Sequence, residues 1–227
     1  MQPDTNFAKA ATYIRSAAAQ GAHLAVLPEY HLTNWLPRDP HFAALCANWR
    51  VYVQKYQDLA RECNICIVPG TIVQTNDEVA PPAHSTLAPS TAKPSAESAT
   101  EPTADGSVAS NTGGVADYRS TPNYLSNVAY FIDNRGEILR SYTKKNLWGP
   151  TEREHLTSSG RQPHPVIETP LGKVGLLICW DLAFPEAFRE LIAQGCKMVV
   201  LPTFCECLRA EWSFGLGGSL LMNVQGR

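Results

Sequence analysis

The stretch KVGLLICWDLAFPEAFRELIAQGCKMVVLP, residues 173–202, decides the fold class. Its first part, residues 173–178, is a short apolar run and predicts a buried strand. Pro185 in the first turn and Gly195 at the end are typical of a helix between them. Met198–Pro202 is again a continuous apolar strand. Helices that alternate with buried strands indicate an α/β layer architecture.

The same alternation extends through the rest of the chain. Apolar residues recur with helical or strand periodicity, and turn residues separate the segments. The predicted helices cover residues 6–20 and about 40–63, and the predicted strands cover residues 23–27, 65–73, 126–132, 137–142 and 166–169. A long loop is expected over residues 144–162.

Composition and charge exclude several classes of protein. The 227 residues are 44% apolar, with a net charge of −2 and a pI near 6.3. Such a balance provides no long-range attraction to nucleic acid or to an anionic membrane. The longest apolar runs are too short to span a bilayer, and the N-terminal residues lack the pattern of a secretory signal. We therefore expect a soluble cytoplasmic protein without nucleic-acid or membrane partners.

The seven cysteines are an odd number, which argues for reduced thiols. Cys63 and Cys66 have the spacing of a redox or zinc pair. A zinc site would need a second matching pair, and Cys205 and Cys207 have the wrong spacing for the common ones. We therefore expect Cys63 and Cys66 to act as small buried apolar residues, and no metal site is predicted.

One segment differs in composition from the rest. Residues 76–122 are mostly Ala, Ser, Thr and Pro with almost no large apolar side chain, so burial cannot offset their ordering entropy. This predicts a disordered insertion between two strands, and a regulated tether is the functional alternative. Residues 1–75 and 123–203 would then form one domain in two parts, followed by the unassigned tail 204–227.

Three polar residues stand where buried strands end, namely Glu29, Lys144 and Cys179. Ligand crevices of open α/β sheets lie beyond the carboxyl ends of strands. A thiol is mostly protonated at neutral pH, so a nearby glutamate would serve as its general base. A lysine would stabilise the negative charge of a tetrahedral adduct. Each residue alone is ordinary, but the combination predicts a nucleophilic site.

Three blocks of the sequence resemble the nitrilase superfamily of carbon–nitrogen hydrolases. They read GAHLAVLPEY at residues 21–30, YTKKNLWGPTERE at residues 142–154 and VGLLICWDLAFPE at residues 174–186. The resemblance implies a four-layer αββα sandwich that assembles as a homodimer and uses no metal or organic cofactor.

The resemblance also implies a catalytic triad of Glu29, Lys144 and Cys179. In this family the thiol attacks a nitrile, amide or carbamoyl carbon, expels ammonia or an amine, and forms a thioester that water hydrolyses. The residues after the cysteine, Trp180-Asp-Leu-Ala-Phe, resemble the amidase and carbamoylase branches more than true nitrilases. We therefore expect an amide or carbamoyl substrate, with a nitrile as the weaker choice.

Two further residues are expected to bind the substrate. A second family glutamate matches Glu152 by spacing, with Glu154 as the rival, and the backbone amide of Trp180 would be the second oxyanion donor.

The sequence departs from the family pattern at both ends. Family members begin with an apolar strand before the first helix, and they continue past Pro202 with further strands and a helix. We therefore expect a sandwich that is incomplete at both ends. Two alternatives follow: a catalytically inactive nitrilase-like fragment that acts only as an interaction partner, and an unrelated α/β binding module.

Overall fold

The computed structural model describes residues 2–76, 125–204 and 219–223. The predicted disordered insertion therefore lies outside the described residues, apart from Asn76, and so does most of the predicted tail. The division of the chain into these segments stays a prediction.

The first sheet is built around one long strand, β4. Strand β5 pairs with one edge of β4, while β2 and β3 follow one another along its other edge, all antiparallel. Strand β1 extends the sheet by pairing in parallel with β2. The strands are β1 (Leu24–Val26), β2 (Cys66–Val68), β3 (Ile72–Thr75), β4 (Leu125–Ile132) and β5 (Ile138–Thr143).

The single strand predicted over residues 65–73 is wrong, because the chain bends sharply at Gly70. This glycine has a φ of +57°, and a Cβ atom there would lie 1.8 Å from the carbonyl oxygen of Pro28. Only glycine combines that backbone conformation with so close an approach. The bend packs the β2–β3 turn against the residue that precedes Glu29.

The second sheet has the strand order β6-β7-β8-β9, with β7 and β8 parallel and the outer pairs antiparallel. Its strands are β6 (Val166–Thr169), β7 (Gly172–Leu176), β8 (Met198–Pro202) and β9 (Ser219–Asn223). Strand β9 lies in the tail, residues 204–227, for which the sequence predicted no structure. Its backbone pairs along the whole of β8.

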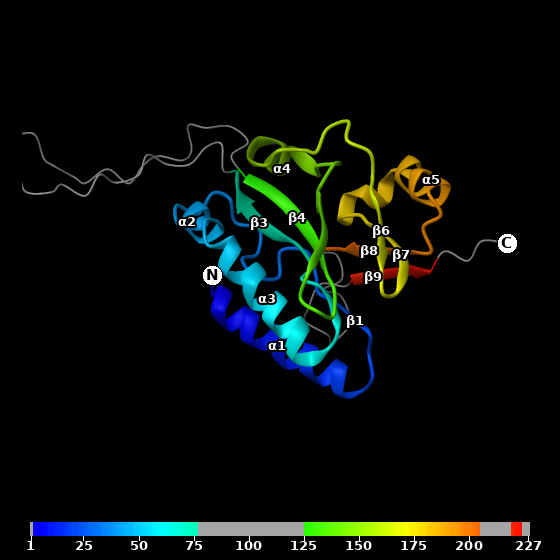
Figure 1. Cartoon of the computed structure of the whole chain (residues 1–227). Helices are drawn as coiled ribbons and strands as arrows, with labels where there is room; N and C mark the ends of the chain where they lie inside the picture. The colour runs from blue at the N-terminus through cyan, green and yellow to red at the C-terminus, as the bar shows by residue number, and fades with distance from the viewer. Residues whose placement is uncertain (1, 77–124, 205–218, 224–227) are drawn as a thin grey trace, which may run out of the picture.

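The two sheets pack face to face, and helices cover their outer faces (Figure 1). Helices α1 (Pro3–Ala19) and α3 (Trp49–Cys63) bury Ile14 and Tyr56 against the first sheet. On the second sheet Gly175 faces Leu191 of helix α5 (Pro185–Ala193). Its neighbours Val174 and Leu176 therefore point from the opposite face of β7 towards the first sheet. The layers therefore run helix, sheet, sheet, helix, which confirms the predicted α/β sandwich.

The helices differ from the predictions in two places. The helix expected at about 40–63 is divided near Asn48, and the loop expected over 144–162 contains a short helix that begins with Gly149 and Pro150. The helices are α1 (Pro3–Ala19), α2 (Phe42–Cys46), α3 (Trp49–Cys63), α4 (Gly149–His155) and α5 (Pro185–Ala193). Within the described part of the chain, none has the length and apolar character that crossing a bilayer requires.

Candidate active site

The Glu29 side chain lies three residues beyond β1 and is 2% exposed. Its Oε1 accepts hydrogen bonds from Lys144 Nζ and from Asn127 Nδ2, both at 2.9 Å. Its Oε2 accepts a hydrogen bond from the backbone N–H of Phe204 at 3.1 Å. Buried charges are stable only when they are paired and hydrogen-bonded, and both oxygens of this carboxylate meet that condition.

Lys144 follows β5 directly and is completely buried. Its backbone N–H donates to the carbonyl of Asn127 on β4 at 2.9 Å, so the β4–β5 register sets its position. Its Nζ lies 2.9 Å from Glu29 Oε1 and 2.8 Å from Glu152 Oε1. Two carboxylates thus share one ammonium, and the formal charges of the cluster sum to −1.

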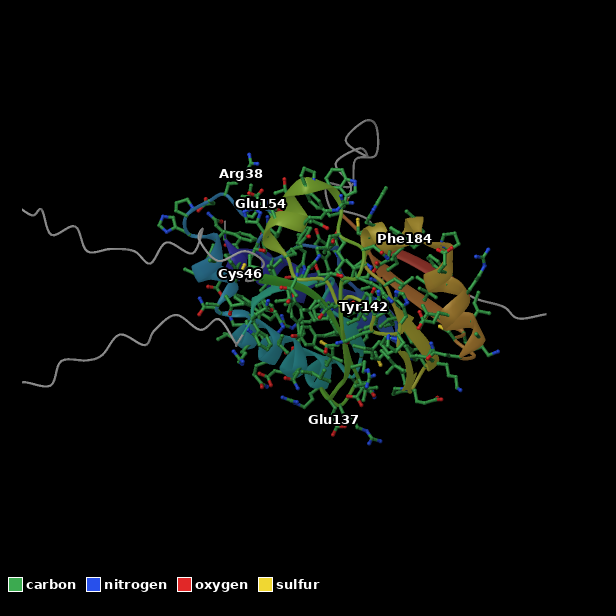
Figure 2. The ribbon with its side chains drawn as sticks, turned by 90° about the horizontal axis from the view of Figure 1, so that it is seen from above. Arg38, Cys46, Glu137, Tyr142, Glu154 and Phe184 are labelled. Atoms are coloured by element: carbon green, nitrogen blue, oxygen red, sulfur yellow. The ribbon has the colours of Figure 1, made fainter. Side chains whose placement is uncertain are left out.

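The structure brings Glu152, and not Glu154, to this cluster. Glu152 Oε1 also accepts a hydrogen bond from the Tyr30 hydroxyl at 2.7 Å, and its Oε2 accepts one from the backbone N–H of Trp148 at 2.6 Å. Glu154 lies on the outer side of α4 with 65% of its side chain exposed (Figure 2). The two residues lie on opposite sides of a short helix, and only one side faces Lys144.

Cys179 opens the 3₁₀-helix Cys179–Ala183, which follows β7. Its φ is +42°, in the left-handed region that residues other than glycine rarely adopt. Its Sγ donates a weak hydrogen bond to the carbonyl oxygen of Phe204 at 3.7 Å. Strained conformations of this kind persist where the surrounding structure enforces them, often at functional sites.

The fully buried carboxylate of Asp181 holds this turn in place. Its Oδ2 accepts hydrogen bonds from the backbone N–H of Ile178 at 2.8 Å and from the Tyr142 hydroxyl at 2.9 Å. Its Oδ1 accepts two from Asn146, from the backbone N–H at 3.0 Å and from Nδ2 at 2.8 Å. Figure 2 shows Tyr142 near the middle of the molecule. Asp181 therefore joins the loop after Lys144 to the turn that begins at Cys179.

The electrostatics keep the thiol neutral beside a carboxylate. Burial raises the pKa of Cys179 to about 12; the Glu29 carboxylate adds to this rise and Lys144 opposes it. Burial also raises the pKa of Glu29, against the lowering effect of Lys144. Burial works against the Lys144 ammonium, yet Glu29 and Glu152 outweigh it and raise its pKa. The cluster therefore combines a thiol that is protonated at neutral pH, a glutamate whose pKa is raised and an ammonium whose pKa is raised.

Sequence reasoning missed four residues of this cluster. Asn127 is a polar residue within a fully buried strand, and Asp181 and Tyr30 stand within quoted blocks, so each offered a signal. Phe204 offered none, because it bonds Glu29 and Cys179 through its backbone.

Trp180 borders a cleft of about 300 Å³. Its side chain is 39% exposed. The cleft is lined by Lys145, Asn146, Leu147, Arg153, Ser158, Trp180 and Phe184. The expected role of the Trp180 backbone N–H as an oxyanion donor stays a prediction.

Cys63 and Cys66, the two cysteines with the spacing of a zinc pair, lie within or next to regular secondary structure. Cys66 is buried in β2 and Cys63 is half-buried at the end of α3, and both are free thiols. Among the described residues, no three His, Cys, Asp or Glu side chains gather as metal ligands would.

Comparisons with known proteins place this geometry in context. A family model described as carbon-nitrogen hydrolase matches residues 1–93 and 103–217. A deaminated glutathione amidase of Bos taurus is 26% identical over 212 residues, which are 88% of this chain and 51% of that protein. A hydrolase in the pqqF 5′ region of Pseudomonas protegens is 34% identical over 85 residues, 37% of this chain and 30% of that protein. The chain thus spans about half the length, or less, of these relatives.

Solved structures share the fold at low sequence identity. The NitN amidase of Nesterenkonia sp. AN1 superposes with a TM-score of 0.60 at 22% identity, over 89% of this chain and 62% of that chain. A mutant of that amidase, with a TM-score of 0.59 at 22% identity over 88% of this chain and 59% of its own, carries the acetamide moiety of fluoroacetamide covalently at its active site cysteine.

Proposed function

The chain belongs to the carbon–nitrogen hydrolase family, and from this premise we propose that it hydrolyses the C–N bond of a small amide or carbamoyl substrate through a thioester on Cys179. One observation carries the proposal: the buried Glu29 carboxylate, bonded to the Lys144 ammonium at 2.9 Å, raises the pKa of the neighbouring Cys179 thiol. In this proposal Glu29 is the base, Lys144 is the cation that stabilises the oxyanion, and Cys179 is the nucleophile.

The first half of the reaction forms the thioester. Glu29 takes the proton of Cys179 Sγ while the sulfur attacks the carbonyl carbon, because a thiol of raised pKa needs a base to become nucleophilic. The Lys144 ammonium and the Trp180 backbone N–H stabilise the oxyanion. The C–N bond then breaks, and the nitrogen leaves as ammonia or an amine with the proton returned by Glu29.

The second half releases the acid. Glu29 takes a proton from water while the water oxygen attacks the thioester carbon. The C–S bond breaks, the sulfur regains a proton from Glu29, and the acid leaves. One amide bond and one water molecule are consumed, and no redox cofactor is required.

Glu152 acts as a positioning residue for Lys144. Its carboxylate is held by Tyr30 and by the backbone N–H of Trp148, so it offers the Nζ atom of Lys144 a fixed second partner at 2.8 Å. The amidase names of several relatives and the Trp-Asp-Leu that follows Cys179 favour amides over nitriles. A homodimer and a cytoplasmic location complete the proposal, and light scattering and cell fractionation would test them.

Ammonia release from a panel of amides, ureido acids and nitriles tests the function. We expect release from amides or carbamoyl amines, a transient acyl adduct on Cys179 by mass spectrometry, and loss of both in Cys179→Ala. Cys63→Ala is the matched control, because this half-buried thiol is no part of the proposed reaction. The absence of turnover and of any adduct across the panel would favour the inactive interaction partner instead.

A further inference from the structure

Asn127 places an amide side chain inside a fully buried strand. Strand β4 is buried along its whole length, and Asn127 itself is 0% exposed. Side chains of a strand alternate between its two faces, so Asn127 points the same way as Ala129 and Phe131, into the layer between the two sheets. Asparagine is depleted in strands, and an apolar side chain would suit this buried position better. Its presence there needs an explanation.

The amide of Asn127 is satisfied on one side only. Its Nδ2 donates to Glu29 Oε1 at 2.9 Å, whereas its Oδ1 is buried without a hydrogen-bond partner among the described residues. The reverse orientation of the amide would set Oδ1 against a carboxylate oxygen, so the donor must face Glu29. An unpaired buried acceptor destabilises a fold. The asparagine therefore provides a contact to Glu29 at the expense of stability.

The backbone of the same residue holds the other half of the buried ion pair. The carbonyl oxygen of Asn127 accepts a hydrogen bond from the backbone N–H of Lys144 at 2.9 Å. Asn127 also lies opposite Val73 in the β3–β4 register, so strand pairing fixes its position. One residue of β4 therefore contacts both Lys144, through its backbone, and the Glu29 carboxylate, through its side chain.

The two oxygens of Glu29 are left in different states by these contacts. Oε1 accepts two hydrogen bonds, from Lys144 Nζ and from Asn127 Nδ2, both at 2.9 Å. Oε2 accepts one, from the backbone N–H of Phe204 at 3.1 Å. A carboxylate has about four acceptor sites, two on each oxygen. Oε1 is therefore saturated, and Oε2 keeps a site for a proton.

The free site of Oε2 lies on the side of the thiol. Phe204 donates its N–H to Oε2, and its carbonyl oxygen accepts from Cys179 Sγ at 3.7 Å. The oxygen and the sulfur thus bind neighbouring atoms of one residue. A side-chain hydrogen bond also joins Cys179 to Glu29. Oε2 is therefore the oxygen placed to take the thiol proton.

We propose that Asn127 is a positioning residue for the general base: with Lys144 it saturates Oε1 of Glu29, so that the proton of Cys179 is taken by Oε2. The proton moves from Sγ to Oε2, and the electron pair stays on the sulfur that attacks the substrate. Without the Asn127 N–H, Oε1 would have a free acceptor site, and protonation there would leave the base inactive. The inference rests on the proposed hydrolase function and concerns how Glu29 acts in it.

Two substitutions of different size test this. Asn127→Ala and Asn127→Leu both remove the N–H donor and the unpaired acceptor, and the first leaves space where the second fills it. We expect kcat of amide hydrolysis to fall about tenfold with KM little changed. The acidic midpoint of the kcat/KM profile should move to higher pH, because the ionised form of Glu29 has lost a donor. Ser126→Ala, a buried change on the opposite face of β4, is the control and should leave the profile unchanged.

Labelling of Cys179 by iodoacetamide, located by mass spectrometry and followed across pH, separates this inference from the hydrolase function. In the intact protein the labelling rate should have an acidic midpoint set by Glu29, and Asn127→Ala should raise that midpoint. In Glu29→Gln the midpoint should be absent, and adding Asn127→Ala should change the rate no further, because Asn127 acts through Glu29.

Three results overturn the inference: an equal effect of Asn127→Ala with and without Glu29, an unchanged labelling profile in both Asn127 variants, or loss of the native circular dichroism spectrum in both. The last would show that Asn127 serves the fold. Absence of turnover in the intact protein contradicts the hydrolase, and the labelling profiles then still decide whether Asn127 acts through Glu29.

Discussion

Replacing Lys144 by Met removes one charge from the most buried part of the site and keeps a side chain of similar length. Lys144 is fully buried, and its Nζ is shared by Glu29 Oε1 at 2.9 Å and Glu152 Oε1 at 2.8 Å. In Lys144→Met these two carboxylates would face one another without a cation.

The magnitude follows from that geometry. Removing one partner of a buried ion pair costs about 3–5 kcal/mol, because an uncompensated charge remains. Here Asn127 and the backbone of Phe204 still bond Glu29, and Tyr30 still bonds Glu152. We therefore expect a loss at the lower end of this range, about 3 kcal/mol of unfolding free energy at pH 8.

The loss should depend on pH with a definite sign. Lys144 lowers the pKa of Glu29, which burial raises, so its removal lifts that pKa further above the unfolded value. A carboxyl group with a raised folded-state pKa destabilises the protein as pH rises from the unfolded towards the folded value. The loss of unfolding free energy in the variant should therefore be larger at pH 8 than at pH 5.

Urea unfolding followed by circular dichroism at pH 5 and pH 8 measures this. With a slope of about 2 kcal/mol per molar urea, the midpoint should fall by about 1.5 M at pH 8. The double variant Lys144→Met with Glu152→Gln should lose less than the sum of the single changes, because one of the opposed charges is gone. A deficit below about 1 kcal/mol, or one equal at both pH values, would refute the reasoning.

Three further outcomes are expected. The kcat/KM of amide hydrolysis should fall at acidic pH, because protonated Glu29 cannot accept the thiol proton. The midpoint of this fall should lie above the ordinary glutamate pKa of about 4.3. A lower midpoint in an initial-rate pH profile would show that another group is the base. Gly70→Ala should cost more than about 2 kcal/mol in urea unfolding, whereas Gly160→Ala, also at positive φ but in open space, should cost about 1 kcal/mol. Asp181→Asn should lower kcat/KM at least about tenfold and slow iodoacetamide labelling of the nucleophilic thiol while the circular dichroism spectrum is kept; unchanged labelling would contradict a positioning role.

Local patterns predicted much of the fold. The strands at 166–169 and 198–202 and the helix that begins at Pro185 agree with the structure within a residue, because apolar runs and a proline in the first turn act over a few neighbours. The errors concern features that depend on distant partners. The break at Gly70 reflects the approach of Pro28, and β9 is defined by its pairing with β8.

The sequence by itself determined which chemical groups are present, where buried strands end, and that Glu29, Lys144 and Cys179 stand at those ends. Tertiary structure alone decided that Glu29 and Lys144, 115 positions apart, are 2.9 Å apart in space. It also decided that the backbone of Phe204, 175 positions from Glu29, completes the cluster. The physical reason is the sequence distance over which each effect acts. Helix and strand preferences depend on neighbours in the chain, whereas burial, strand pairing and pKa shifts depend on which distant segments the packed sheets bring together.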